Sequence, residues 1–214
     1  NNGAVQFGID ARFATLATTK ASYFILNGGV LRWASNATVN LDSKRGITLG
    51  ANGGTFSVAN TANNPAFGNA LTYNGVITGS SAFTKSGNGW LSIGGQNTYT
   101  GATQVNQGAL LLNFAATGAP ASNIINSSSN LVLGSMVGQN DSGIGSSLIP
   151  SNFGANPTLF IQAGTSGGSQ TFNGTTISAG ANNVIGRGNG TNSATLDLGA
   201  IGRTAGGTVS FSTL

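Results

Sequence analysis

The chain has 214 residues, of which 35 are glycine and only 6% are charged. It contains no cysteine and no histidine, which excludes disulfides, thiolate metal sites and catalysis by an imidazole base. The net charge of +4 comes from eight basic residues spread along the chain, and we therefore expect no nucleic-acid partner, because such binding needs clustered Lys and Arg.

Short bursts of alternating aliphatic residues recur along the chain, and a glycine follows each of them. They lie at 47–49, 91–93, 131–133 and 196–198, and end at Gly50, Gly94, Gly134 and Gly199. The alternation places two aliphatic side chains on one face, which predicts short strands with one buried face. The glycines predict turns with positive φ. No stretch approaches the roughly 18 apolar residues of a spanning helix, so no transmembrane segment is expected.

Glycine pairs precede a second set of predicted strands. The segment 53–58 reads GGTFSV and closely matches 206–211, GGTVSF, while looser copies begin at Gly28 and Gly167. Several aliphatic positions are separated by one or two steps of about 20 to 22 residues, which is typical of stacked repeats. The repetition therefore indicates an array of similar strand-forming units.

Two all-β architectures fit this pattern. One is a parallel β-helix, a solenoid in which Asn–Gly pairs form corners and stacked Asn side chains form ladders. The alternative is an antiparallel β-sandwich, in which the same Asn–Gly pairs form hairpin turns. The spacing favours the β-helix, with about ten rungs. Residues 1–214 are expected to form a single β-helical domain or a segment of a longer repeat protein, with a loop-rich insertion at 115–157 around the strand 131–133.

The segment 87–110 is the most specific part of the chain. It resembles the autotransporter-associated β-strand repeat, also named the passenger-associated transport repeat. The matching positions are Gly89, Leu91, Ile93, Gly95, Asn97, Thr98, Tyr99, Thr100, Gly101, Thr103, Val105, Gly108 and Leu110. Trp90 departs from the family, which usually has a small residue there. The resemblance extends over 45–113, less closely over 157–214 and loosely over 1–44.

The resemblance implies a right-handed parallel β-helix displayed outside the cell or on a bacterial outer surface, and it implies no catalytic activity. The motif itself can be explained by folding. Leu91, Ile93, Val105 and Leu110 are expected to face the core, with Leu131 and Leu133 of the later burst. Tyr99 is expected to bury its ring while its hydroxyl is either hydrogen-bonded or in contact with water.

We predict no catalytic, cofactor-binding or metal-binding residues. The only tight acid–base cluster, 42–45 (Asp-Ser-Lys-Arg), is interpreted as a solvated turn with a weak ion pair. Six aromatic residues could form a sugar-stacking platform, although burial in the core is the preferred interpretation. These are Phe7, Phe13, Tyr23, Phe24, Trp33 and Trp90.

The functional prediction is a structural cell-surface protein, a building block of an extracellular fibre, sheath or passenger stalk. The alternative is an adhesin or a module that binds a surface glycan, and a polysaccharide-degrading enzyme comes third. Neither terminus shows a clear capping segment. We therefore expect self-association head to tail, or continuation into neighbouring repeats.

Overall fold

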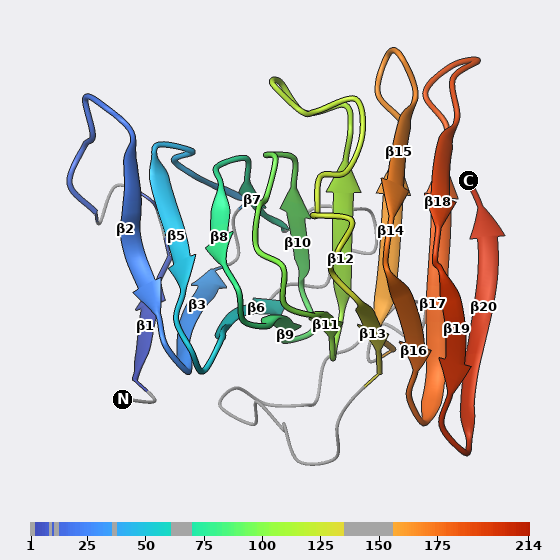
Figure 1. Cartoon of the computed structure of the whole chain (residues 1–214). Coiled ribbons are helices and arrows are strands. Elements are labelled where there is room, and N and C mark those ends of the chain that lie inside the picture. The colour runs from blue at the N-terminus through green and yellow to red at the C-terminus, as the bar shows by residue number, and fades with distance from the viewer. Residues whose placement is uncertain (1–2, 9, 11–12, 36–37, 61–69, 135–155) are drawn as a thin grey trace.

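The computed structural model describes residues 3–8, 10, 13–35, 38–60, 70–134 and 156–214. Within these ranges the chain forms twenty strands and no helix. The strands stack side by side along one axis, from the first residues at one end to the last residues at the other (Figure 1).

Two long sheets run the length of the molecule. Sheet 1 contains, in spatial order, β1 (Ala4–Phe7), β3 (Gly29–Ser35), β6 (Gly54–Asn60), β9 (Phe83–Ser86), β11 (Thr103–Val105), β13 (Leu131–Leu133), β16 (Gly174–Ile177) and β19 (Ala200–Arg203). Sheet 2 contains β4 (Val39–Leu41), β7 (Ala70–Tyr73), β10 (Trp90–Ile93), β12 (Ala109–Asn113), β14 (Thr158–Gln162), β17 (Gly180–Arg187) and β20 (Gly207–Thr213).

A third side of the molecule is built in two pieces. The N-terminal piece contains β2 (Lys20–Leu26), β5 (Arg45–Leu49) and β8 (Ile77–Gly79). The C-terminal piece contains β15 (Gly168–Thr171) and β18 (Ala194–Asp197). Between them, the chain passes through 97–100 and 123–125 without forming strands.

Every pair of neighbouring strands is parallel. The chain visits the sheets in the same cyclic order, so each turn lies on the previous one as a rung. This arrangement confirms the parallel β-helix and excludes the antiparallel β-sandwich.

The number of rungs is smaller than predicted. Sheet 1 contains eight strands, so the described chain makes eight rungs rather than about ten. Paired residues in this sheet are 20 residues apart for Phe83 and Thr103 but 44 apart for Leu131 and Thr175. The prediction took the shortest spacing as the common one, whereas loops lengthen most rungs.

The core consists of inward-facing columns that run through the rungs. One column in sheet 2 joins Leu71, Leu91, Leu110, Leu159 and Val184 in register, and all five are buried. The predicted inward residues of the bursts at 91–93 and 131–133 are also fully buried. Parallel stacking lets like side chains cover one another from rung to rung, which removes their apolar area from water.

The glycine pairs play one repeated role. The first glycine has positive φ and the second begins or immediately precedes a strand in all four copies, which start at Gly28, Gly53, Gly167 and Gly206. Side chains are strained at such φ values, whereas glycine is not. The prediction that a glycine pair enters each strand is therefore confirmed.

The glycines after the aliphatic bursts are less uniform. Gly134 and Gly199 have positive φ, as predicted, but Gly50 and Gly94 do not. A Cβ at Gly50 would lie 2.8 Å from Cβ of Asn27, and one at Gly94 would lie 2.8 Å from Oδ1 of Asn74. At these two corners glycine is favoured by the close approach of a residue on the preceding rung, rather than by the backbone angle.

Asparagine ladders occur at the corners, as predicted. The backbone N–H and the side-chain amide of Asn52 both donate to Oδ1 of Asn27, at 2.9 and 3.0 Å. The amide of Asn173 donates to Oδ1 of Asn130 at 3.2 Å. Each pair joins two rungs at a turn.

The region 115–157 was predicted as a loop-rich insertion around the strand 131–133. Residues 115–130 do form turns and loops, and β13 follows them. The rest of the predicted insertion, 135–155, lies outside the described residues.

Candidate functional site

The apolar positions of the repeat motif all face the core. Leu91, Ile93, Val105 and Leu110 have no exposed surface, and Tyr99 is equally buried. They lie on β10, β11, β12 and the segment that joins β10 to β11. Because each is covered by a residue of the next rung, they stabilise stacking and offer no surface to a ligand.

The motif glycines lie where another rung passes too close for a side chain. A Cβ at Gly95 would overlap the carbonyl oxygen of Gly75, and one at Gly101 would overlap the backbone of Ser81. Gly108 has φ of 62°, and a Cβ there would lie 2.6 Å from the carbonyl oxygen of Gly87. The sequence pattern located these glycines, but only the stacking gives the reason for them.

Asn97 bridges three consecutive rungs. It is 2% exposed; its Oδ1 accepts the N–H of Ile77 at 2.9 Å, and its amide donates to the carbonyl of Ile124 at 2.9 Å. It therefore joins 97–100, which forms no strand, to β8 on one side and to 123–125 on the other. Buried backbone groups need such partners, because an unpaired group costs about 1–3 kcal/mol.

Gln170 performs a similar task two rungs further on, and the sequence did not reveal it. Its Oε1 accepts the N–H of Ile125 at 3.0 Å, and its Nε2 donates to the carbonyl of the same residue at 2.9 Å. A side-chain amide thus pairs with a backbone as a strand would. Nothing in local sequence identifies which amide lies opposite an unpaired backbone.

A chain of buried hydroxyls crosses the interior at the motif. The Tyr99 hydroxyl lies 2.7 Å from Oγ1 of Thr103, which lies 2.9 Å from Oγ of Ser129. The Ser129 hydroxyl donates to the carbonyl of Gly101 at 2.7 Å. Burial raises the pKa of Tyr99 above its ordinary value, so the hydroxyl stays neutral. The hydroxyl is therefore hydrogen-bonded, which is the first of the two predicted alternatives.

The remaining motif threonines hydrogen-bond through their backbones to the preceding rung. The N–H groups of Thr98 and Thr100 donate to the carbonyls of Ile77 and Gly79, at 2.9 and 3.1 Å. Both side chains are exposed. Gly89 donates its N–H to the carbonyl of Val58 at 2.7 Å. Every predicted motif position therefore contributes to the packing of one rung on the next.

Lys85, one of the eight basic residues spread along the chain, is buried. It faces inward on β9, has no exposed surface and lies in register with Phe56 of the preceding rung. Its Nζ donates to the carbonyls of Ser86, Gly87 and Gln107 at 2.8, 2.7 and 3.0 Å. Burial lowers its pKa to about 7. Three carbonyl acceptors match the three protons of an ammonium group and hold two turns together.

Trp90 was noted as a departure from the family. It lies on β10 in register between Ala70 and Ala109, and its ring centroid is 5.6 Å from that of Phe160. The two aromatic rings pack against each other on this face of sheet 2.

The cluster at 42–45 is not simply a solvated turn, which corrects the prediction. Arg45 is 1% exposed, and its guanidinium donates to both carboxylate oxygens of Asp10, at 3.0 and 3.2 Å. It also donates to the carbonyl of Ala14, at 2.9 Å. The Lys44 amine donates to the carbonyls of Leu16 and Ala17, at 3.1 and 3.2 Å. The prediction failed because Asp10 is 35 residues away in the sequence.

These contacts hold the segment between β1 and β2 against the first rung. We name its described residues, Asp10 and 13–17, the N-terminal cap. The Phe13 ring lies 5.3 Å from that of Phe7 and 5.1 Å from that of Phe24, and the Arg45 guanidinium lies 5.3 Å from its centre. The expectation that neither terminus supplies a cap is therefore wrong at the N-terminal end.

The six aromatic residues considered for sugar stacking do not form an exposed platform. Phe7 and Trp33 are buried in the core. Phe13, Tyr23 and Phe24 are half-buried and pack on one another in the first rung. The preferred interpretation, burial and packing between rungs, is confirmed for this cluster.

The described residues contain no group of three or more acidic, histidine or cysteine side chains placed to hold a metal ion. Across the same ranges, the fold has no long apolar helix of the kind that crosses a bilayer.

Comparison with known proteins gives two matches. Residues 83–112 match the family "Passenger-associated-transport-repeat". The chain is also 41% identical over 86 residues to "Adhesin BmaC autotransporter" of Brucella suis biovar 1 (strain 1330). That alignment covers 40% of this chain but 2% of the much longer adhesin. No solved structure is significantly similar to the chain.

The family match begins two residues before Lys85 and contains all thirteen predicted motif positions. It therefore coincides with the central rungs, where Asn97, the buried hydroxyls and Lys85 join one turn to the next. The chain carries a passenger-associated transport repeat within a parallel β-helix and resembles part of an autotransporter adhesin.

Proposed function

We propose that this chain is a structural stretch of a bacterial surface-displayed passenger. It is a β-helical building block that lengthens end to end into a stalk, sheath or fibre. The observation that carries the proposal is the use of the motif. Each of its positions is engaged in stacking rungs, and the same motif matches a family associated with passengers. A relative that is itself an autotransporter adhesin supports location on the outer surface.

The chemistry of the chain supports a non-enzymatic role. The buried polar groups at the motif hydrogen-bond to backbone carbonyls or to one another, and Asp10 is neutralised by Arg45. General acid–base catalysis needs a titratable group within reach of a substrate. Lys85, the group with a pKa near neutrality, is fully enclosed.

Surface display is tested with an antibody raised against the purified chain. It should label intact cells of the bacterium that produces the protein, and protease added outside those cells should remove the signal. An antigen protected in intact cells but cleaved after lysis would contradict the proposal.

End-to-end lengthening is the finer part of the proposal. It covers stacking on another copy and continuation into neighbouring repeats of a longer polypeptide. Negative-stain images of the purified chain should show rods longer than a single eight-rung solenoid. Single short particles at all concentrations would leave only continuation within a longer polypeptide.

A second candidate is adhesion, and the relative's name favours it. The protein would then bind a surface glycan or a host protein through residues that face outward from the rungs. A glycan array probed with the folded chain separates the two functions, because a purely structural stalk should bind no glycan above background.

A further inference from the structure

Six of the seven Asn–Gly pairs in the sequence lie within the described residues, and such pairs can lose ammonia without an enzyme. The glycine nitrogen attacks Cγ of the asparagine side chain, the Cγ–Nδ2 bond breaks, and ammonia leaves with the proton of the glycine N–H. Water then opens the resulting succinimide ring to aspartate or isoaspartate. Glycine favours the attack because it has no Cβ to hinder the nitrogen. The reaction needs a free N–H and a backbone that can rotate, so the fold decides which pair reacts.

In three of the pairs the attacking nitrogen is already engaged. The N–H groups of Gly28, Gly53 and Gly89 each donate to a backbone carbonyl, at 2.7, 2.9 and 2.7 Å. Asn27 and Asn52 are also joined side chain to side chain in a ladder. Ring closure at these corners would first have to break hydrogen bonds of the folded chain, which costs free energy.

Two further pairs are held by close packing or by strand pairing. Gly75 is buried, and a Cβ there would overlap the hydroxyl of Tyr73. Gly174 begins β16, which pairs with a strand on each side, and the side-chain amide of Asn173 donates to Asn130. Rung stacking therefore protects all five of these pairs.

Asn189 and Gly190 form the sixth pair, at the tip of the loop that joins β17 to β18. Figure 1 shows this loop projecting beyond the strand ends, beside the loop that joins β14 to β15. Gly190 is exposed with φ of 63°, and a Cβ there would meet no atom within 4 Å apart from its chain neighbours. Among the hydrogen bonds of the described residues, none uses the N–H of Gly190 or the side chain of Asn189. Both requirements for ring closure are met at this pair.

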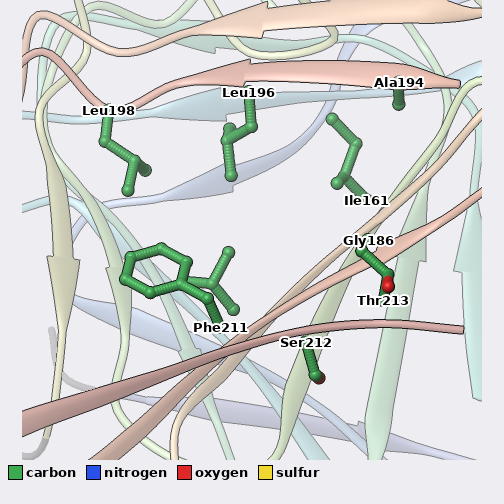
Figure 2. Close-up of a pocket in the computed structure, with 9 residues that line it drawn as sticks. Ile161, Gly186, Ala194, Leu196, Leu198, Phe211, Ser212 and Thr213 are labelled. Carbon is green, nitrogen blue, oxygen red and sulfur yellow. The ribbon is translucent and has the colours of Figure 1, made fainter.

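The base of the loop is fixed, so the freedom of its tip is local. Asn189 and Asn192 donate their N–H groups to each other's carbonyl, at 2.9 and 3.1 Å. The side-chain amide of Asn192 donates to the carbonyl of Thr165 on the neighbouring loop at 2.9 Å. Below the loop, Gly186 of β17 and Ala194 of β18 line a cavity of about 350 Å³ between the strands (Figure 2). A chemical change at 189 should therefore alter the turn and leave the rungs intact.

We propose that Asn189 is a site of spontaneous deamidation, with water as the co-reactant. Either product carries a charge at neutral pH, because a carboxyl group has a pKa of about 4, so the modification adds one negative charge to a chain whose net charge is +4. Isoaspartate also adds a methylene to the backbone, which disrupts the paired hydrogen bonds between Asn189 and Asn192. The inference goes beyond the proposed function, since it depends on this loop alone.

Peptide mapping of the purified 214-residue chain, after incubation at mildly alkaline pH, tests the proposal. Trypsin cuts after Arg187 and Arg203, so Asn189 is released in a peptide, 188–203, that contains no other Asn–Gly pair. Mass spectrometry should locate a gain of about 1 Da at Asn189, which appears at least about tenfold faster than at any of the other five described pairs.

Two controls accompany this measurement. In urea, where the corners are no longer packed, all six pairs should react at similar rates, which shows that the fold causes the difference. Asn189→Gln keeps the amide but requires a larger and slower ring closure, so the peptide should stay unmodified and the melting temperature should not change.

Three results would overturn the proposal. Position 189 could stay unmodified in the native chain while the unfolded chain reacts, a corner pair could react as fast as Asn189, or the gain in mass could lie at Asn192. None of these results affects the antibody test of surface display, which fails only if the chain is not on the cell surface.

Discussion

Lys85 joins two turns of the solenoid from inside the core. Its position in an inward column would ordinarily hold an apolar side chain, as the neighbouring rungs do at Phe56 and Val105. The amine instead reaches the carbonyls of two turns, and no carboxylate is needed. Burying a cation without a counterion costs free energy, even when carbonyls accept its hydrogen bonds. The protonation of Lys85 should therefore change the free energy of unfolding.

Lys85→Met is expected to reduce the free energy of unfolding by about 2–4 kcal/mol, because three carbonyls lose their donor. Urea denaturation followed by circular dichroism measures this loss. Lys20→Met, at an exposed position on β2, is the matched control and should change stability by less than about 0.5 kcal/mol. An equal loss of stability in both variants would show that the hydrogen bonds of the buried Lys85 amine do not stabilise the fold.

The same residue predicts a pH dependence. The pKa of Lys85 falls from 10.5 to about 7 on folding, so between these values the unfolded chain binds more protons than the native one. Stability should therefore rise as the pH increases from about 7 to 9.5, and the rise should disappear in Lys85→Met. If the free energy of unfolding changes with pH in the same way in the wild type and in Lys85→Met, Lys85 does not titrate in this pH range.

At this scale the sequence was a good guide to apolar residues and a poor one to charges. Alternation alone placed Leu91, Ile93 and Leu131 in the core, because a strand has period two. Arg45 was interpreted as part of a solvated turn, since a charge is normally exposed, and nothing in the sequence singled out Lys85 as buried. Their partners are backbone carbonyls and a distant aspartate, which no local pattern reveals.

Among the elements, the N-terminal cap is the least regular and the most dependent on specific contacts. Its described residues form no strand, and the hydrogen bonds to Arg45 and Lys44 tie it to the turn before β5. The hydrogen bonds that Arg45 donates to the Asp10 carboxylate raise the pKa of Arg45 above its ordinary value, so the guanidinium stays charged at any working pH. The cap should therefore detach when this ion pair is broken.

Asp10→Asn is expected to cost about 2 kcal/mol, because Arg45 would remain buried without its counterion, although Asp10 itself is partly exposed. Hydrogen exchange should quicken in residues 13–24 and stay unchanged in the central rungs. Asp42→Asn is the matched control. It keeps an oxygen to accept the N–H of Lys44 and should be nearly silent. If both substitutions loosen the cap equally, the ion pair is not what holds it.

The whole molecule behaves as a one-dimensional stack, in which each rung is stabilised by its two neighbours. A defect in a central rung breaks contacts on both sides, whereas a defect in the last rung breaks them on one. The described chain has six interior rungs in sheet 1, between β1 and β19. The effect of a substitution should therefore depend on its position along the axis.

Ile93→Asp, in a central rung, is expected to prevent folding, because it would bury an unpaired carboxylate at a cost above about 4 kcal/mol. Phe211→Asp, in the last rung, should lower the melting temperature only slightly, since the side chain is already 60% exposed. Thermal melts followed by circular dichroism compare the two. A folded Ile93→Asp variant would contradict the arrangement of the core.

The short alternating bursts, the glycine pairs and the motif at 89–110 were enough to establish an all-β chain of stacked repeats and to locate its inward faces. These features depend on residues close together in the chain, where period and backbone freedom act directly. The number of rungs, the amide bridges of Asn97 and Gln170, the burial of Lys85 and the cap held by Arg45 depend on which segments the stacking brings together. Those partners lie 20 to 45 residues apart, and variable loops decide which rung faces which. Local patterns carry no information about that choice, because it is made by the packing of one complete turn on the next.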